Sequence, residues 1–251
     1  MRPLALSFSK YAHSYDEYAT LQQVVFQRLE AELEKKAIAP RHILDIGCGT
    51  GTHTISFLKR YPNATITGID LAPSMIEYAK ESYGHLAVDF EIGDARGLPE
   101  SGVYDLIVSN ATLQWVPDLK KVLAHIQTKL APEGTCVLTL FGPQTFWELQ
   151  QCLATVLGRP HMVAASAFNS ASQIHQVASE IFPDIRFKQE LIKKRYLSLL
   201  DLLKHIKFTG SNPVFPNTRM WTPGLIQEIE TLYLASYRAI QATYQVFYLT
   251  K

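Results

Sequence analysis

A short apolar strand runs into alternating glycines at His42-Ile43-Leu44-Asp45-Ile46-Gly47-Cys48-Gly49-Thr50-Gly51. Glycines in such a loop let the backbone turn tightly and approach a ligand without a clash from a Cβ atom. A dinucleotide-binding GxGxxG pattern beginning at Gly47 would need glycine or alanine at position 52, where this chain has Thr52. The third glycine falls at Gly51 instead, which argues against an NAD-binding loop.

The segment around this loop, residues 42–142, alternates short apolar runs with helix-like stretches. That alternation predicts an α/β fold with a parallel sheet. Five strands are predicted, at His42–Ile46, Thr65–Asp70, Asp89–Gly93, Tyr104–Ser109 and Thr135–Phe141. Three helices are predicted between them, at Thr52–Arg60, Pro73–Tyr83 and Leu119–Leu130, and the last is expected to stop at the turn Ala131-Pro132-Glu133-Gly134.

The flanking residues predict more helices and two further strands. Tyr15–Lys36 has apolar residues at helical spacing, which indicates one or two N-terminal helices. After Gly142, helices are expected at Thr145–Leu157, Ser170–Ile181, Leu197–Lys207 and Pro223–Gln241, with turns at Thr209–Thr218 and β-rich runs at Arg186–Tyr196 and Thr243–Thr250. Two late strands added to five parallel ones predict a seven-stranded, Rossmann-like sheet.

The chain is therefore predicted to be a single domain over residues 1–251. Residues 1–40 supply N-terminal helices, and residues 41–142 form the ligand-binding core. Residues 143–251 supply the final strands and a helical cap inserted over the carboxyl edge of the sheet.

The composition is that of an ordinary globular protein, with 47% apolar and 19% charged residues. Three cysteines without a close pair predict neither a disulfide framework nor a zinc site, and eight scattered histidines predict no other metal site. No stretch has the ~18 apolar residues of a membrane span, and the N-terminus lacks a signal peptide's apolar run. The protein is expected to be cytoplasmic and monomeric, with no membrane partner.

Polar residues follow three of the predicted strands, at the edge where open α/β sheets bind ligands. Asp70 ends the second strand, Asp94 and Ala95 follow the third, and Asn110 follows the fourth. The carboxylate of Asp70 suits two ribose hydroxyls, Asp94 suits an adenine amino group, and Asn110 suits an ammonium group or the opening to a second substrate. Each could instead cap the next helix, but their shared register favours a ligand site.

The GxGxG loop resembles the first motif of class I S-adenosylmethionine-dependent methyltransferases, in which the turn accommodates the amino-acid part of the cofactor. The resemblance implies S-adenosyl-L-methionine as the cofactor, S-adenosyl-L-homocysteine as a product, and no metal. The cofactor-binding residues that it implies are Tyr15, Asp45, Gly47, Gly49, Gly51, Asp70, Leu71, Met75, Asp94, Ala95 and Asn110.

Five further segments resemble the malonyl-acyl carrier protein O-methyltransferase family of biotin synthesis. They are Phe8–Gln22, Ser109–Trp115, Phe146–Gln150, Leu203–Ser211 and Thr243–Val246, so the resemblance spans nearly the whole chain. Two elements are selective against other small-molecule methyltransferases, the sequence SNATLQW at the second segment and the dipeptide Thr243-Tyr244.

This resemblance implies esterification of the free carboxylate of a malonyl thioester carried on acyl carrier protein. The ester neutralises a charge that an apolar fatty-acid synthase pocket would otherwise have to desolvate. An acceptor that is already an anion needs an in-line approach but no general base. The catalytic residues implied are Tyr15, which closes the N-terminal helix over both ligands, and Gln114 and Trp115, which line the acceptor site.

The charge distribution is uneven along the chain. Residues 1–150 hold 13 Lys and Arg against 17 Asp and Glu, whereas residues 151–251 hold 11 against 6. Because carrier proteins are acidic, the resemblance implies a docking face, and the residues assigned to it are Arg195, Lys204 and Lys207. A solvated basic face without a partner explains the same composition equally well.

Other functions remain open from the sequence. A methyltransferase of a quinone precursor or of a free small acid would share most of these features. A cofactor-binding protein without catalysis would share the loop and the strand ends. Nucleic-acid methylation is disfavoured, because the chain has no Asn-Pro-Pro-Tyr-type tetrapeptide after the fourth strand and no obvious basic stacking channel.

Overall fold

The structure is a computed structural model of the chain, and it describes residues 2–98, 102–210 and 221–251. A single sheet of seven strands organises it, in the order β3-β2-β1-β4-β5-β7-β6. The first five strands are parallel, and β7 runs antiparallel to both of its neighbours. The strands are β1 (His42–Ile46), β2 (Thr65–Asp70), β3 (Val88–Ile92), β4 (Tyr104–Ser109), β5 (Leu130–Phe141), β6 (Arg186–Tyr196) and β7 (Ile240–Thr250). The predicted seven-stranded α/β fold is confirmed.

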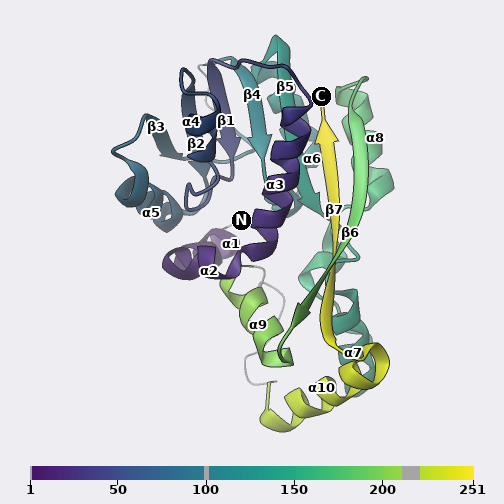
Figure 1. Cartoon of the computed structure of the whole chain (residues 1–251). Helices are drawn as coiled ribbons and strands as arrows, with labels where there is room; N and C mark the ends of the chain where they lie inside the picture. The colour runs from purple at the N-terminus through teal and green to yellow at the C-terminus, as the bar shows by residue number, and fades with distance from the viewer. Residues whose placement is uncertain (1, 99–101, 211–220) are drawn as a thin grey trace.

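Helices flank this sheet on both faces and continue past one edge (Figure 1). In chain order the α-helices are α1 (Arg2–Lys10), α2 (Tyr15–Tyr18), α3 (Thr20–Glu34), α4 (Ser56–Arg60), α5 (Pro73–Tyr83), α6 (Leu119–Lys129), α7 (Trp147–Leu157), α8 (Ala171–Ile181), α9 (Leu199–Phe208) and α10 (Pro223–Tyr237). The described residues also form three short 3₁₀ turns, η1 (Ala12–Ser14), η2 (Leu113–Trp115) and η3 (Ala164–Ala167). No helix in the described part of the chain is long and apolar enough to cross a membrane.

Neighbouring residues of the central strands enter two different cores. In β4, Leu106 and Val108 pack against α3, α4 and α5, whereas Ile107 packs against α6 and α8 on the opposite face. Strands buried on both faces are largely apolar, because most of their side chains enter a core. This is why β1, β2 and β4 were predicted from the sequence with the bounds that the structure shows.

A lobe extends beyond the carboxyl edge of the parallel strands (Figure 1). It consists of α7, α9 and α10 with the adjoining ends of β6 and β7, and its core includes Leu149, Leu202, Ile229 and Tyr244. Helix α8, which was expected in the cap, instead packs Ile174 with α6 beside the sheet. The cap therefore has fewer helices than predicted.

Several predicted boundaries were wrong for identifiable reasons. Strand β5 begins at Leu130, because that residue pairs with Tyr104 and the turn at residues 131–134 forms an irregularity inside the strand. Helix α10 ends at Tyr237 and not Gln241, since Arg238 adopts a left-handed conformation with φ of 59°. Helix α1 was not predicted. Residues 211–218 of the expected turn region lie outside the described residues.

Glu148 joins the lobe to the sheet. Its side chain is 0% exposed, and its carboxylate accepts hydrogen bonds from the Thr243 backbone N–H at 2.9 Å and from the Thr243 hydroxyl at 2.5 Å. The Thr243 carbonyl in turn accepts from the N–H of Phe146, which has a φ of 64° at the start of α7. Both backbone groups of Thr243 thus fix the first turn of α7 against β7.

We expect Glu148→Ala to lower the free energy of unfolding by about 3 kcal/mol, because it leaves the Thr243 N–H and hydroxyl buried without an acceptor. Chemical denaturation monitored by circular dichroism measures this. The matched control is Glu228→Ala on the exposed face of α10, which is expected to change stability by less than about 0.5 kcal/mol. Equal effects of the two substitutions would show that the Glu148 bonds do not stabilise the lobe.

Candidate active site

A cavity of about 110 Å³, partly open to solvent, lies at the carboxyl ends of the parallel strands. The loops after β1, β2, β3 and β4 supply its floor, and the N-terminal helices cover it. Most of the predicted site residues line it, namely Tyr15, Asp45, Gly47, Gly49, Asp70, Leu71, Met75, Asp94, Ala95, Asn110 and Trp115. The sequence thus identified residues that the fold brings together at one point.

The glycine loop lies so close to the neighbouring strand end that side chains are excluded. Gly47 has a φ of +77°, and a Cβ atom at this position would lie 2.2 Å from Oγ1 of Thr112. Its backbone N–H donates to the Ile69 carbonyl at 2.7 Å, which holds the loop against the end of β2. Gly51 does not line the cavity, because it packs under the loop, where a Cβ atom would lie 2.8 Å from the ring of Phe90.

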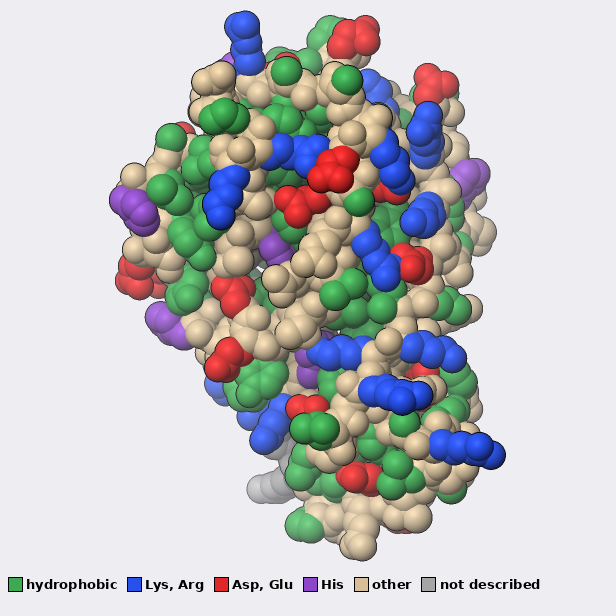
Figure 2. All heavy atoms as spheres, in the orientation of Figure 1, with side chains coloured by type: hydrophobic (Ala, Val, Ile, Leu, Met, Phe, Trp, Pro, Cys, Tyr) green, Lys and Arg blue, Asp and Glu red, His purple; other side chains and the backbone are tan. Residues whose placement is uncertain are grey.

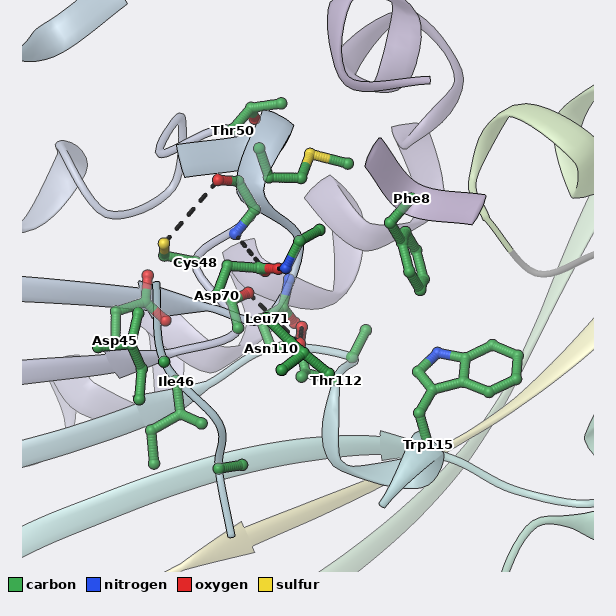
Figure 3. A pocket seen from close by; sticks show the side chains of 18 of the residues that line it. Phe8, Asp45, Ile46, Cys48, Thr50, Asp70, Leu71, Asn110, Thr112 and Trp115 are labelled. Carbon is green, nitrogen blue, oxygen red and sulfur yellow. Dashed lines mark hydrogen bonds between the residues drawn. The ribbon is translucent and has the colours of Figure 1, made fainter. Parts of the chain in front are cut away.

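Asp70 bridges the loops that follow β1 and β2 (Figure 3). One carboxylate oxygen accepts from the Gly49 N–H at 3.0 Å, and the other accepts from the Ala72 N–H at 2.8 Å. Burial raises the pKa of this carboxyl group, and the backbone hydrogen bonds oppose that shift. Each carboxylate oxygen has two lone pairs, so Asp70 keeps acceptor capacity for ligand hydroxyls.

Asp45 is a more deeply buried carboxyl group below the loop. It is 5% exposed and accepts a hydrogen bond from the Thr54 hydroxyl at 2.6 Å. Burial raises its pKa to about 7, against the effect of Thr54, and the nearby charge of Asp70 adds to the increase. Since a cation beside a carboxyl group favours its ionised form, these two groups suit a positively charged ligand.

His53 and Cys48 line the cavity without being poised for chemistry. The imidazole of His53 stacks on Phe26 with ring centroids 4.3 Å apart, and burial lowers its pKa to about 4. Burial raises the pKa of the Cys48 thiol well above its ordinary value. Near neutral pH both side chains are therefore uncharged. Within the described ranges, no group of three or more His, Cys, Asp or Glu side chains is placed to hold a metal ion.

The N-terminal segment forms a lid over the cavity. Asp16 of α2 accepts hydrogen bonds from the hydroxyls of Thr50 and Thr52, both at 2.8 Å, which fastens the lid to the glycine loop. Phe8 of α1 makes an edge contact with Trp115, with ring centroids 6.3 Å apart. Figure 3 shows these two rings facing one another, to the right of the other labelled residues of the cavity. Tyr15, at the start of α2, is the lid residue that lines the cavity beside Asp16, and burial raises the pKa of its hydroxyl.

The side chain of Asn110 forms hydrogen bonds within the protein, at a position where the sequence predicted a contact with a ligand. Its side-chain N–H₂ donates to the Gln22 backbone carbonyl at 3.0 Å, and its side-chain oxygen accepts from the Thr139 hydroxyl at 2.8 Å. The side chain thus ties α3 to the sheet, while the residue still lines the cavity. Its predicted contact with the cofactor remains a prediction.

Gln114 lies away from the cavity, although it was expected to line the acceptor site. Its amide N–H₂ donates to the Ala111 carbonyl at 2.7 Å, and its oxygen accepts from the Phe141 N–H at 3.4 Å. These bonds brace the backbone of Ala111, which has a φ of 51°. Strained backbone of this kind is concentrated at functional sites. We interpret Gln114 as a residue that positions the turn before Trp115.

The carboxylate of Asp94 is paired with the neighbouring side chain of Arg96. The guanidinium of Arg96 forms an ion pair with it at 2.6 Å, and hydrogen bonding from Arg96 is the main cause that lowers the pKa of the Asp94 carboxyl. The ion pair is accessible to water, so exchange of Arg96 for a ligand costs little free energy. Asp94 therefore remains a candidate contact for the cofactor.

A second, much smaller cavity of about 10 Å³ adjoins the first. Gln22 and Trp115 line both, so they mark the junction. The other walls of the second cavity come from the lobe and from β5, and they are mostly aromatic or small, namely Phe141, Thr145, Phe146, Ala164, Ala165, Phe168, His205, Thr209 and Tyr244. No local sequence pattern indicates this cavity, because its walls come from segments far apart in the chain.

The predicted docking residues lie outside both cavities. Arg195 on β6 and Lys204 and Lys207 on α9 are exposed. Figure 2 shows Lys and Arg side chains gathered on the visible face of the lobe. A surface of this kind can attract an acidic partner, and nothing in its geometry requires one.

Comparison with known proteins defines the class. Residues 40–201 match a family described as methyltransferase domain. The YcgJ protein of Bacillus subtilis has the same fold, with a TM-score of 0.59 at 17% identity over 88% of this chain and 96% of that one. Phosphoethanolamine N-methyltransferase 2 of Haemonchus contortus, solved with S-adenosyl-L-methionine, has a TM-score of 0.58 at 15% identity over 96% of this chain and 56% of that one. The fold is that of a class I methyltransferase.

The relatives found by sequence define the family more narrowly than the structural neighbours do. A protein of Ilyobacter polytropus named malonyl-acyl carrier protein O-methyltransferase 2 is 30% identical over 97% of this chain and 94% of its own length. A malonyl-acyl carrier protein O-methyltransferase of Halalkalibacterium halodurans is 32% identical over 96% of this chain and 94% of its own length. The chain belongs to the malonyl-acyl carrier protein O-methyltransferase family, as its motifs predicted.

We expect Asp16→Ala to loosen the lid, because it removes the carboxylate that accepts from Thr50 and Thr52. Amide hydrogen exchange across residues 5–18 should become about 10-fold faster, the effect of losing two partly exposed hydrogen bonds. Glu17→Ala, at the adjacent exposed position of α2, is the control and should leave the exchange unchanged. Unchanged exchange in Asp16→Ala would mean that aromatic contacts alone hold the lid.

Proposed function

We propose that this protein transfers the methyl group of S-adenosyl-L-methionine to the free carboxylate of a malonyl group on acyl carrier protein. The observation that carries the proposal is the junction of two cavities with different chemistry. The larger cavity is acidic, while the smaller one is aromatic and lacks a usable base. The names of the sequence relatives support malonyl-acyl carrier protein as the acceptor.

The larger cavity fits the proposed cofactor, which carries two cationic groups and two ribose hydroxyls. Four carboxyl groups line it, those of Asp16, Asp45, Asp70 and Asp94, and no Lys or Arg does so among the residues described. When bound, S-adenosyl-L-methionine supplies an activated methyl group on a sulfonium sulfur. Asp70 would accept hydrogen bonds from the ribose hydroxyls. Gly47 has no side chain, so the loop would leave room for the amino-acid part of the cofactor.

The smaller cavity selects for an acceptor that is already ionised. Among its described residues the titratable side chains are His205 and Tyr244. Burial lowers the pKa of His205 to about 3, which makes it a poor base, and burial raises the pKa of Tyr244 well above its ordinary value. Both groups are therefore weak bases, whereas a carboxylate acceptor needs no deprotonation.

The protein's remaining contribution is positioning and exclusion of water. Trp115 stands at the junction, where it contacts Phe8 on one side and Phe168 on the other, with centroids 6.3 and 4.9 Å apart. A rigid aromatic wall restricts the acceptor to a narrow approach, and alignment of two reactants is a large part of the acceleration available to such a reaction. The lid covers part of the same cavity and so limits the access of solvent to it.

We further propose that the surface formed by Arg195, Lys204 and Lys207 docks the acidic carrier protein, and that the enzyme works as a cytoplasmic monomer. Helices α9 and α2 are in contact near the cavities, so a carrier bound at α9 would lie beside the lid. Arg195 has a second explanation, because β6 is the outer strand of the sheet and charged side chains protect such edges from pairing.

Methyl transfer from labelled S-adenosyl-L-methionine tests the proposed reaction, with malonyl-acyl carrier protein, malonyl-coenzyme A and free malonate compared as acceptors. We expect the carrier-bound malonyl group to be methylated with the highest kcat/KM, because both the acceptor cavity and the basic surface then contribute. Methylation of free malonate at least as efficient as that of malonyl-acyl carrier protein would overturn the assigned acceptor. Absence of methylation of both thioesters would overturn it as well. Binding of S-adenosyl-L-homocysteine by calorimetry shows whether the preparation is competent.

Reversal of charge at Lys204→Glu together with Lys207→Glu should raise KM for malonyl-acyl carrier protein about 10-fold at low salt and less at high salt. KM for malonyl-coenzyme A should change little, because that acceptor lacks the carrier's surface. The control is Lys121→Glu, an exposed position on α6, which should leave both values unchanged. Equal effects on the two thioesters would contradict carrier docking.

A further inference from the structure

Gln22 is a buried polar residue at the junction of the two cavities. It is 7% exposed on α3, and it lines both cavities. Its backbone carbonyl accepts from the side chain of Asn110 at 3.0 Å, which fixes this turn of α3 at the end of β4. The side-chain oxygen is buried without a hydrogen-bond partner among the described residues.

Other polar groups of the second cavity are engaged with the protein. A ring N–H of His205 donates to the Tyr18 carbonyl, and the hydroxyl of Tyr244 is hydrogen-bonded to that of Tyr196. The Thr209 hydroxyl donates to the His205 carbonyl at 2.8 Å. The Gln22 amide thus differs from its neighbours in having a group that the fold leaves unsatisfied.

An unsatisfied buried amide is costly, so its persistence at a cavity junction indicates a ligand. The two ends of a glutamine amide have nearly the same shape, and rotation by 180° presents either the oxygen or the N–H₂ group to the same point. An oxygen would accept from a cationic group, whereas an N–H₂ would donate to an anion.

Charge decides between these orientations. The cofactor cavity already has the carboxyl groups of Asp45 and Asp70 for a cation. The second cavity has no Asp, Glu, Lys or Arg among the described residues that line it, so an anion there would need a neutral donor. We infer that the N–H₂ of Gln22 donates a hydrogen bond to the carboxylate that receives the methyl group. This inference rests on the proposed function.

Gln22 would then determine specificity as well as position. A donor at the junction fixes one carboxylate oxygen, which leaves the other oxygen to face the methyl group. The ester product carries no charge, and a hydrogen bond to a neutral ester is weaker than one to a carboxylate. The same contact therefore favours binding of the acid over retention of its ester.

Two substitutions at this position distinguish the two orientations. Gln22→Met keeps the length of the side chain and removes the hydrogen bond, and Gln22→Glu places a negative charge at the junction. If the amide donates to the acceptor carboxylate, KM for malonyl-acyl carrier protein should rise about 10-fold in Gln22→Met and further, about 100-fold, in Gln22→Glu. The affinity for S-adenosyl-L-homocysteine, measured by calorimetry, should change less than about 2-fold in both.

The matched control is Gln23→Met, which alters an exposed glutamine at the next position of the same helix. Thermal denaturation of each variant checks that the fold is retained. Binding of malonyl-pantetheine in the presence of S-adenosyl-L-homocysteine gives a readout independent of turnover, and it should weaken in the same order as KM.

Three results would overturn the inference. Tighter binding of S-adenosyl-L-homocysteine by the Gln22→Glu variant than by the Gln22→Met variant, with KM for the acceptor unchanged, would assign the amide oxygen to the cofactor's ammonium group. Unchanged acceptor and cofactor binding in both folded variants would show that the amide serves neither ligand. Lower thermal stability of the Gln22 variants, with acceptor and cofactor binding unchanged, would show that Gln22 stabilises the fold and does not bind the acceptor. The unsubstituted protein distinguishes failure of this inference from failure of the proposed function. If the proposed function is wrong, the unsubstituted protein does not methylate malonyl-acyl carrier protein.

Discussion

The two hydrogen bonds that Asp70 accepts hold the carboxyl edge of the sheet in its working shape. They join the Gly49 N–H, in the loop after β1, to the Ala72 N–H at the start of α5. The position of the glycine loop in turn fixes Thr50, whose hydroxyl donates to Asp16 of the lid. One partly buried carboxylate therefore determines where the cavity floor lies and where its cover is fastened, while its remaining lone pairs stay available to a ligand.

The lid also depends on the lobe at the other end of the chain. Phe8 packs so closely on Gly210 that a Cβ atom there would lie 2.3 Å from the ring. Phe208 stacks on Tyr18 with centroids 4.4 Å apart and makes an edge contact with Tyr11. The N-terminal helices thus lie between the glycine loop and α9. A movement of the lid would open the cofactor cavity and alter the second cavity together.

The sequence predicted the sheet and the cofactor cavity better than the acceptor side, for physical reasons. Strands buried on both faces are visible as apolar runs, and ligand-binding residues of the cofactor cavity follow those strands directly. The roles of Asn110 and Gln114 depend on bonds to Gln22 and Phe141, so local pattern does not indicate them. The second cavity forms only when α3, η2 and the lobe meet. Helix α1 was missed because its apolar residues were interpreted only as too few for a signal peptide.

The division of charge between the cavities follows from the proposed reaction. Carboxyl groups around the cofactor attract a cation, and the same groups repel an acceptor carboxylate, so the acceptor needs a separate compartment. The second cavity supplies one, with Gln22 and Trp115 at the boundary and without an acidic residue among the described lining. Methyl transfer removes the sulfonium charge and the carboxylate charge in the same step. The product cofactor would keep its ammonium group for the acidic lining of the larger cavity, whereas the Gln22 amide would lose its anion, so the transfer would weaken the binding of the ester more than that of the spent cofactor.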